Sequence, residues 1–204
     1  MDAISNCIVT DAIYDKEDET TVAKFLKESM ANKNKKAITT DLDSKYHQII
    51  IKLGFKHQLY IFHAKKSLNK QLKVFKDKFN LSEEKYEEYH QQLKIIKNLF
   101  DLDDYDEAEK ELQSLIYRKN EFYPAIYEII RKSISPRYKS FIYHIKDNRI
   151  EKTSNKIGNA FQKTMPKSRK RIFKTTQCVL KRIYRRDLIW NDNSKKDYEN
   201  QQSF

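Results

Sequence analysis

The chain has 204 residues, of which 34% are charged and 12% aromatic, and its net charge is +12. This composition is too aromatic for a disordered tail and too charged for a membrane protein, and no apolar run reaches the roughly 18 residues of a membrane-spanning helix. The length supports one sizeable core, which favours a single domain with a helical insertion over two full domains.

The two cysteines, Cys7 and Cys178, form no motif, so a reduced intracellular setting is the default. The N-terminus shows no basic segment followed by an apolar one, as a secretory signal would have. We therefore expect a cytoplasmic protein, associated with the nucleoid if it is bound to DNA. We expect neither a membrane nor a small-molecule cofactor among its partners.

The first third of the sequence alternates segments with strand and helix patterns, which indicates an α/β sheet layer. Strands are expected where β-branched and aromatic residues cluster, and helices where apolar residues recur at intervals of three and four. The expected elements are a strand over Cys7–Tyr14, a helix over Val22–Met30, a strand over Lys36–Thr40, a helix over Tyr46–Leu53 closed by Gly54, and a strand over Gln58–Phe62.

Residues 64–135 have a different pattern, in which apolar residues repeat at helical spacing through three consecutive segments. These segments run over Leu68–Phe79, Tyr86–Phe100 and Tyr105–Leu115, and Asp104 with Glu107 predicts a capping box for the third. A further short helix is expected over Phe122–Ile129, broken near Pro136. Such stripes are far more often core than chemical sites, so this region is predicted to be a helical insertion.

The C-terminal part begins with a short apolar stretch over Phe141–Ile145 and continues with a helix over Ser154–Thr164, in which Ile157, Ala160 and Phe161 would be buried. A basic link over Lys167–Lys174 leads to a last helix. The residues expected to be buried in that helix are Leu180, Ile183, Tyr184 and Leu188, and the polar tail Asn191–Phe204 is expected to fray. The predicted organisation is therefore residues 1–63 as a sheet portion, 64–135 as the insertion, 136–190 as a returning helical part and 191–204 as a tail.

The excess charge lies in one stretch. Residues Lys152–Lys196 hold 14 lysines and arginines against two aspartates, and the rest of the chain is neutral. A basic stretch of this kind favours the binding of a polyanion such as nucleic acid. The alternative is that these residues form a solvated helix face without a binding role. The residues expected to contact DNA are Lys167, Arg169, Lys170, Arg171, Lys174, Lys181, Arg182, Arg185 and Arg186.

Common enzyme motifs are absent, since the chain has two glycines, no CxxC pair, no GxSxG elbow and five histidines without zinc-site spacing. What remains is a set of carboxylates near strand ends. Asp2 precedes the first expected strand, and Asp41 follows the second. Two carboxylates at one sheet edge could share a divalent cation. The alternative is that Asp41 or Asp43 caps the following helix.

The segment ITTDLDSKYHQIIIKLGFKHQLYIFH resembles the central block of DDE-type DNA transposases, the insertion-sequence and Mutator-like enzymes with an RNase H-like fold. The helical stretch and a closing basic helix with Trp190 follow in the family's order. The matching positions are Asp41, Tyr46, His57-Gln58, His63 and Thr153-Ser154-Asn155-Lys156-Ile157. The resemblance implies an α/β fold: an incomplete RNase H-like sheet core with a large all-helical insertion and a basic C-terminal helical segment.

The resemblance also implies two-metal DNA strand cleavage and transfer, in which three carboxylates hold Mg²⁺ or Mn²⁺ and DNA is bound by a homo-oligomer. Asp41 would be the catalytic, metal-binding carboxylate of this chain. The first acid would lie upstream of Met1, with Asp2 as a candidate replacement.

The chain departs from the family's pattern at two further positions. Gly158 stands where the third acid is expected, with Glu151 as a poor substitute, and Tyr60 replaces the family's cysteine. We therefore expect a truncated, inactive transposase-derived protein. The alternatives are a non-catalytic DNA-binding protein, a nuclease with unorthodox ligands around Asp41, and a helical interaction module.

Overall fold

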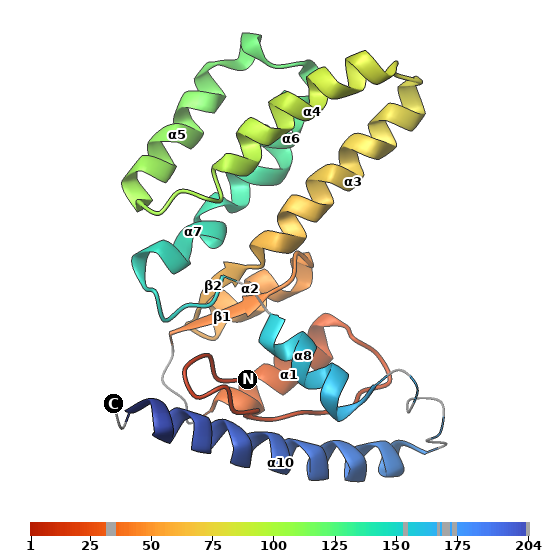
Figure 1. The fold of residues 1–204 in the computed structure, drawn as a ribbon, viewed down its shortest axis with the longest axis vertical. Coiled ribbons are helices and arrows are strands. Elements are labelled where there is room, and N and C mark those ends of the chain that lie inside the picture. The colour runs from red at the N-terminus through yellow and green to blue at the C-terminus, as the bar shows by residue number, and fades with distance from the viewer. Residues whose placement is uncertain (32–35, 153–154, 167, 169–171, 173–174, 203–204) are drawn as a thin grey trace. The chain divides into compact units, whose positions relative to one another are not determined.

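The computed structural model describes residues 1–31, 36–152, 155–166, 168, 172 and 175–202. The chain divides into two compact units, each built from segments that are distant in sequence (Figure 1). Unit 1 comprises Met1–Ala37, Asp43–Phe55 and Thr153–Phe204, and unit 2 comprises Ile38–Leu42 and Lys56–Lys152.

The sheet of the described residues has two parallel strands, β1 (Ala37–Thr40) and β2 (Lys56–Leu59). The Tyr60 N–H extends the pairing by donating to the Thr40 carbonyl at 2.9 Å. The strand predicted over Lys36–Thr40 is confirmed, but the one predicted over Gln58–Phe62 is wrong at its end, because helix α3 (Ile61–Phe79) begins two residues after β2. Ile61 lies at helical spacing from the buried positions that follow it. The end of this apolar run therefore belongs to the helix and not to the strand.

The helices predicted within residues 64–135 are confirmed. α3 is followed by α4 (Glu83–Asn98), α5 (Tyr105–Tyr117) and α6 (Pro124–Ile129), and Figure 1 shows α3 and α4 side by side. Apolar stripes pack into the core of unit 2, although Phe79, at the end of its predicted stripe, is exposed. Members of this core include Leu68, Leu72, Leu93, Ile96, Leu115, Ile126, Ile130 and Ile142.

Local capping explains where these helices begin. The Ser82 side chain accepts the Lys85 N–H at the start of α4, and Asp104 accepts the Glu107 N–H at 2.7 Å at the start of α5, which is one of the two hydrogen bonds of the predicted capping box. The expected break near Pro136 is also present. The chain there makes a π-helical turn and then a 3-10 turn, because proline lacks the N–H that would continue an α-helix. The apolar stretch Phe141–Ile145 then forms part of a further helix, α7 (Tyr138–Lys146).

Unit 1 contains α1 (Glu19–Met30), α2 (Ser44–Lys52), α8 (Asn155–Thr164) and α10 (Thr176–Gln202). α1 packs against α2, and α8 against α10. α2 is capped by Asp43, whose side chain accepts the Lys45 N–H, so Asp41 is not its N-cap. Gly54 closes α2 with a left-handed φ of 84°, as predicted. None of the helices in the described ranges has both the length and the apolar character needed to cross a membrane.

The strand predicted over Cys7–Tyr14 is wrong, because this segment forms neither strand nor helix. Its backbone pairs instead with one side chain of α10. The Ile8 N–H donates to Asn191 Oδ1 at 2.6 Å, and Asn191 Nδ2 donates to the Ile8 carbonyl at 3.0 Å. A carboxamide offers both a donor and an acceptor, so it supplies what a neighbouring strand would have supplied.

The predictions for the C-terminal helices are wrong in three respects. α10 continues to Gln202, so residues from Asn191 are not a frayed tail. Its predicted buried stripe is largely exposed, including Leu180, Tyr184 and Leu188, and Phe161 of α8 is 59% exposed although Ala160 beside it is buried. The buried side of α10 carries polar and aromatic residues at helical spacing. These are Asp187, Trp190, Asn191, Ser194 and Tyr198, of which Asp187 and Ser194 are buried, and Trp190 and Asn191 form hydrogen bonds with the N-terminal segment.

Candidate functional site

Asp41 directly follows β1 in unit 2, where the sequence places a carboxylate at a strand end, and it is exposed. The side chain of the neighbouring Thr40 makes the contacts that fix the backbone at this strand end. The Thr40 hydroxyl donates to the Asp41 carbonyl at 2.9 Å and lies 2.7 Å from His57 Nε2. His57 is fully buried, so this part of the strand end is fixed by packing.

Asp2, the candidate for the first acid, belongs to unit 1, whereas Asp41 belongs to unit 2. Its Oδ1 accepts the Ser5 N–H at 2.7 Å, the Ser5 hydroxyl at 2.8 Å and the Ile4 N–H at 3.1 Å. Partial desolvation would raise the pKa of Asp2, but the hydrogen bonds from Ser5 and Ile4 outweigh it and hold the pKa below its usual value. Asp2 therefore stabilises its own turn.

The motif residues His57-Gln58 join secondary-structure elements of unit 2. Gln58 is fully buried, and its Nε2 donates to the Leu59 and Phe141 carbonyls, both at 2.9 Å. Its Oε1 accepts the His144 N–H at 3.0 Å. Both functional ends of the carboxamide are used, so Gln58 ties β2 to α7.

His63 lies in the first turn of α3, where it is exposed and its ring centroid is 4.4 Å from that of Tyr60. The side chain of His63 is therefore at the protein surface. Across the described part of the chain, no three His, Cys, Asp or Glu residues are grouped as ligands for one metal ion.

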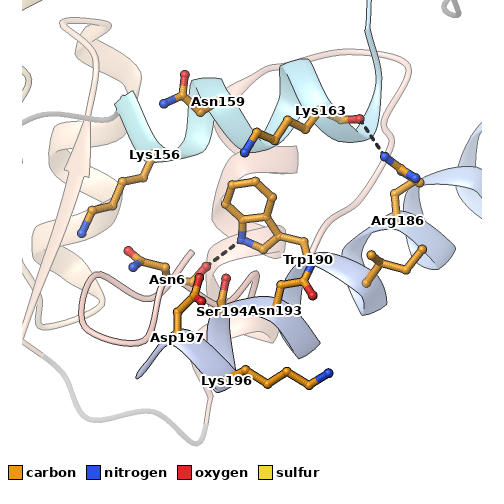
Figure 2. A pocket seen from close by; sticks show the side chains of 11 residues that line it. Asn6, Lys156, Asn159, Lys163, Arg186, Trp190, Asn193, Ser194, Lys196 and Asp197 are labelled. Carbon is orange, nitrogen blue, oxygen red and sulfur yellow. Dashed lines mark hydrogen bonds between the residues drawn. The ribbon is translucent and has the colours of Figure 1, made fainter. Parts of the chain in front are cut away.

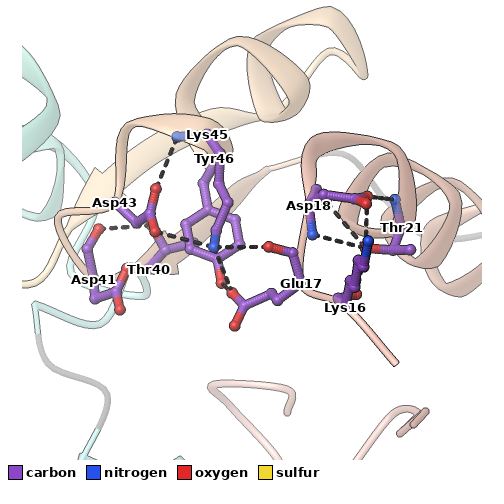
Figure 3. Close-up of polar contacts among 9 residues, drawn as sticks. All are labelled: Lys16, Glu17, Asp18, Thr21, Thr40, Asp41, Asp43, Lys45 and Tyr46. Atoms are coloured by element: carbon purple, nitrogen blue, oxygen red, sulfur yellow. Dashed lines mark hydrogen bonds and ion pairs between the residues drawn. The ribbon is translucent and has the colours of Figure 1, made fainter. Parts of the chain in front are cut away.

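Tyr46 takes part in a surface network of unit 1 (Figure 3). Its phenol donates to the Glu17 carboxylate, and Lys45 Nζ lies 3.2 Å from Glu17 Oε1 and 3.0 Å from Asp43 Oδ2. The hydrogen bond from Tyr46 is the main cause that lowers the pKa of Glu17, followed by the one from Lys45. Tyr46 therefore joins the segment before α1 to the first turn of α2.

Gly158, at the position where the resemblance places the third acid, lies exposed within α8. A Cβ at this position would meet no atom within 4 Å, so alanine fits here without displacing a neighbour. The Glu151 carbonyl, in unit 2, accepts the Thr39 hydroxyl at 2.8 Å. Thr153, Ser154 and the Asn155 side chain lie outside the described residues.

We predict that Gly158→Ala raises the free energy of unfolding by about 0.5–1 kcal/mol, because glycine inside a helix is less stable than alanine by that amount. Thermal denaturation followed by circular dichroism measures the change. Gly54→Ala is the matched control and should have the opposite sign, because the φ of 84° at Gly54 strains any side chain. A loss of stability at Gly158 would show that the exposed face of α8 is covered in solution.

Of the predicted DNA-contacting residues, Lys181, Arg185 and Arg186 are exposed on α10, and Arg182 is half-buried. Arg186 Nη2 lies 3.5 Å from the Lys163 carbonyl near the end of α8, where a cation complements the helix dipole. The predicted residues of the basic link, Lys167, Arg169, Lys170, Arg171 and Lys174, lie outside the described residues.

A pocket of about 590 Å³ lies between α8 and α10. Sequence reasoning missed it, although Lys156 and Lys163 are seven residues apart and therefore share one face of α8.

Asp187, on the buried side of α10, is the carboxyl group with the most altered acidity in unit 1. Burial, followed by a hydrogen bond with Asp11 and repulsion from it, raises its pKa from 3.8 to about 6. The residue is 8% exposed. The N-terminal segment and α10 therefore meet at a pair of carboxyl groups that suits one bound proton.

The raised pKa makes this contact pH-dependent. The stability gained from the bound proton is fully present below the ordinary pKa of 3.8 and is lost as the pH rises through about 6. We predict that Asp187→Asn raises the melting temperature at pH 8 by roughly 2–4 °C and changes it little at pH 4. Asp192→Asn, an exposed position of α10, is the control. An equal gain at both pH values would rule out titration of Asp187 as the cause.

Comparison with known proteins gives one informative relationship. The chain is 30% identical over 180 residues to a protein of Methanobrevibacter smithii named "Insertion element ISM1 uncharacterized 48.3 kDa protein". The match covers 88% of this chain and 45% of the relative, so the chain spans about half of the length of that protein. No protein-family profile matches the chain. No solved structure matches it either. The chain is therefore homologous to part of an insertion-element protein.

Proposed function

We propose that this chain derives from an insertion-element transposase and binds DNA through the C-terminal part of unit 1. The observation that carries the DNA-binding proposal is the confinement of the entire excess charge to Lys152–Lys196, with Lys181, Arg185 and Arg186 exposed on one helix. The homology to an insertion-element protein and the order of the transposase-like motifs support the transposase origin.

Lysines and arginines on a helix surface favour contacts to phosphates. Such contacts release counterions from the duplex and position the protein, but they carry little sequence information. We therefore infer binding that varies little with DNA sequence and weakens steeply with salt.

Fluorescence anisotropy of a labelled 30-base-pair duplex, titrated with the protein at several salt concentrations, tests the proposal. We expect a log–log slope of roughly −4 or steeper, since each neutralised phosphate contributes about −0.9. A slope near zero, or no binding at 50 mM salt, would leave the basic stretch as a solvated surface.

We also propose that this chain binds DNA without cleaving it. By the resemblance, Asp41 is the position of one acid that would bind Mg²⁺ or Mn²⁺, and Gly158 stands at a position where another acid is expected. The described residues do not fit a two-metal centre, because no three potential ligands are grouped among them, and we derive no catalytic step through one. Glycine has no side chain that could bind a metal ion. The glycine at position 158 is therefore the most direct support for the proposal that the chain does not cleave DNA.

A further inference from the structure

The pocket between α8 and α10 is an open depression bordered by three segments of unit 1 (Figure 2). α8 contributes one face, α10 contributes the opposite wall, and the N-terminal turn contributes Asn6. The lining residues are Asn6, Lys156, Asn159, Lys163, Arg186, Ile189, Trp190, Asn193, Ser194, Lys196 and Asp197. A volume of about 590 Å³ lies within the range of roughly 300–1,000 Å³ typical of small-ligand sites.

The charge of the lining favours an anion. Lys156, Lys163, Arg186 and Lys196 are its cations, and Asp197 is its carboxylate. Figure 2 shows Lys163 of α8 over Trp190 and Arg186 of α10 reaching the Lys163 carbonyl, whereas Lys196 extends away from Trp190. The positive fields of Lys163 and Arg186 therefore add on the side of the pocket next to α8. Phosphate is one of the anions that lysine and arginine side chains bind through charge-assisted hydrogen bonds.

Trp190 gives the pocket an aromatic wall. Its indole N–H donates to the Asn6 carbonyl at 2.9 Å, which fixes the orientation of the ring. The Lys163 Nζ lies 5.3 Å from the ring centroid, so the π-face is turned toward the pocket and is reached by a cation. The lysine stem is flexible, and its ammonium group can move from the ring to a phosphate when an aromatic group takes its place.

Asn6 adds an unsatisfied acceptor beside the indole. Its Oδ1 is buried and has no hydrogen-bond partner among the described residues. Its backbone is held at a φ of 56°, a left-handed conformation that asparagine tolerates better than most residues. A buried acceptor without a partner is costly, so an incoming N–H donor would be favoured at this point.

We propose that this pocket binds a single nucleotide unit, with its base against Trp190 and its phosphate beside Lys163 and Arg186. The base supplies the aromatic surface and the N–H donor, and the phosphate supplies the negative charge. The inference goes beyond the proposed DNA binding, because contacts to the backbone of a duplex need neither a pocket nor an aromatic wall. The nucleotide can be free or can be an unpaired residue of a DNA strand.

Trp190 is the single tryptophan of the chain, so intrinsic tryptophan fluorescence reports on this pocket alone. The protein is titrated with dAMP, deoxyadenosine, inorganic phosphate, single-stranded oligo(dA) and a duplex of equal length. We expect dAMP to quench Trp190 at concentrations at least tenfold lower than deoxyadenosine or phosphate. Tighter binding of oligo(dA) than of dAMP would identify the unpaired DNA strand as the source, and similar binding would identify the free nucleotide.

Lys163→Ala is the test variant, and Lys27→Ala, exposed on α1 of the same unit and outside both the pocket lining and the basic stretch, is the matched control. We expect Lys163→Ala to weaken dAMP binding by about tenfold or more, because a charge-assisted contact is lost, and Lys27→Ala to leave it unchanged. Circular dichroism spectra of both variants confirm that they are folded.

Three results would overturn the inference. The first is an absence of quenching by dAMP and oligo(dA), and the second is equal effects of dAMP and phosphate, which would show an anion site only. The third is equal effects of the two variants. In the first case, duplex binding detected by anisotropy would show that this inference fails while the proposed DNA binding stands.

Discussion

Gln58→Leu is expected to lower the free energy of unfolding by about 2–4 kcal/mol. The carboxamide of Gln58 makes three hydrogen bonds inside unit 2, and leucine replaces it with a side chain of similar size that makes none. The Leu59 carbonyl and the His144 N–H would then lose these partners in a buried setting, and each unsatisfied group costs roughly 1–3 kcal/mol. Urea denaturation followed by circular dichroism should show a lower midpoint with an unchanged slope.

Gln91→Leu provides the matched control for this prediction, since Gln91 is exposed on α4. Surface substitutions of this kind usually change stability by less than about 0.5 kcal/mol. If Gln58→Leu were as harmless as Gln91→Leu, the connection from β2 to α7 would not depend on this side chain. The motif residue would then need another explanation.

The double substitution Lys181→Ala with Arg185→Ala is expected to weaken duplex binding by roughly 50-fold at 0.1 M salt. Each lost phosphate contact removes about 0.9 from the log–log slope, which corresponds to nearly tenfold in affinity at this salt concentration. The slope should therefore become shallower by about 2, and the loss should be similar for unrelated sequences. Anisotropy titrations at several salt concentrations measure both quantities.

Lys66→Ala with Lys70→Ala removes the same charge at the same spacing from α3 in unit 2, where both lysines are exposed. This control pair should weaken binding only slightly. Equal losses for the two pairs would show that net charge, rather than the C-terminal surface, drives binding. No loss from the α10 pair would leave those residues as a solvated face.

Local patterns predicted the helical part of unit 2 well. The recurrence of apolar residues gave α3, α4 and α5, and the cap at Asp104 and the left-handed Gly54 lie where short-range rules place them. These features depend on residues three or four positions apart, or on one backbone conformation, so the sequence itself carries the information.

The misplaced strand over Cys7–Tyr14 depended on a distant partner. β-branched residues favour an extended chain, but whether that chain joins a sheet depends on what lies beside it. The partner of Ile8 is Asn191, 183 positions along the chain. The same contact explains why the buried side of α10 was predicted wrongly. Periodicity alone assigned burial to the apolar residues, whereas the polar side of the helix is the one that contacts the N-terminal segment.

The candidate site was predicted in part. Asp41 lies at a strand end, as its position after KAITT indicates, and the basic residues of α10 are exposed. The structural role of Gln58 was not predicted, because its partners on α7 are more than 80 positions away. The pocket was missed for the same reason, since Asn6, Lys163 and Trp190 meet only in the folded unit 1.

A supercoiled plasmid incubated with the protein and Mn²⁺ tests most directly whether this chain binds DNA without cutting it. Half of each sample is run on a native gel, and half is deproteinised before electrophoresis. We expect retarded migration in the native gel at low salt and a plasmid that remains supercoiled after the protein is removed. Nicked circles that form with the natural protein and disappear with Asp41→Ala, or an absence of any retardation, would contradict the proposal.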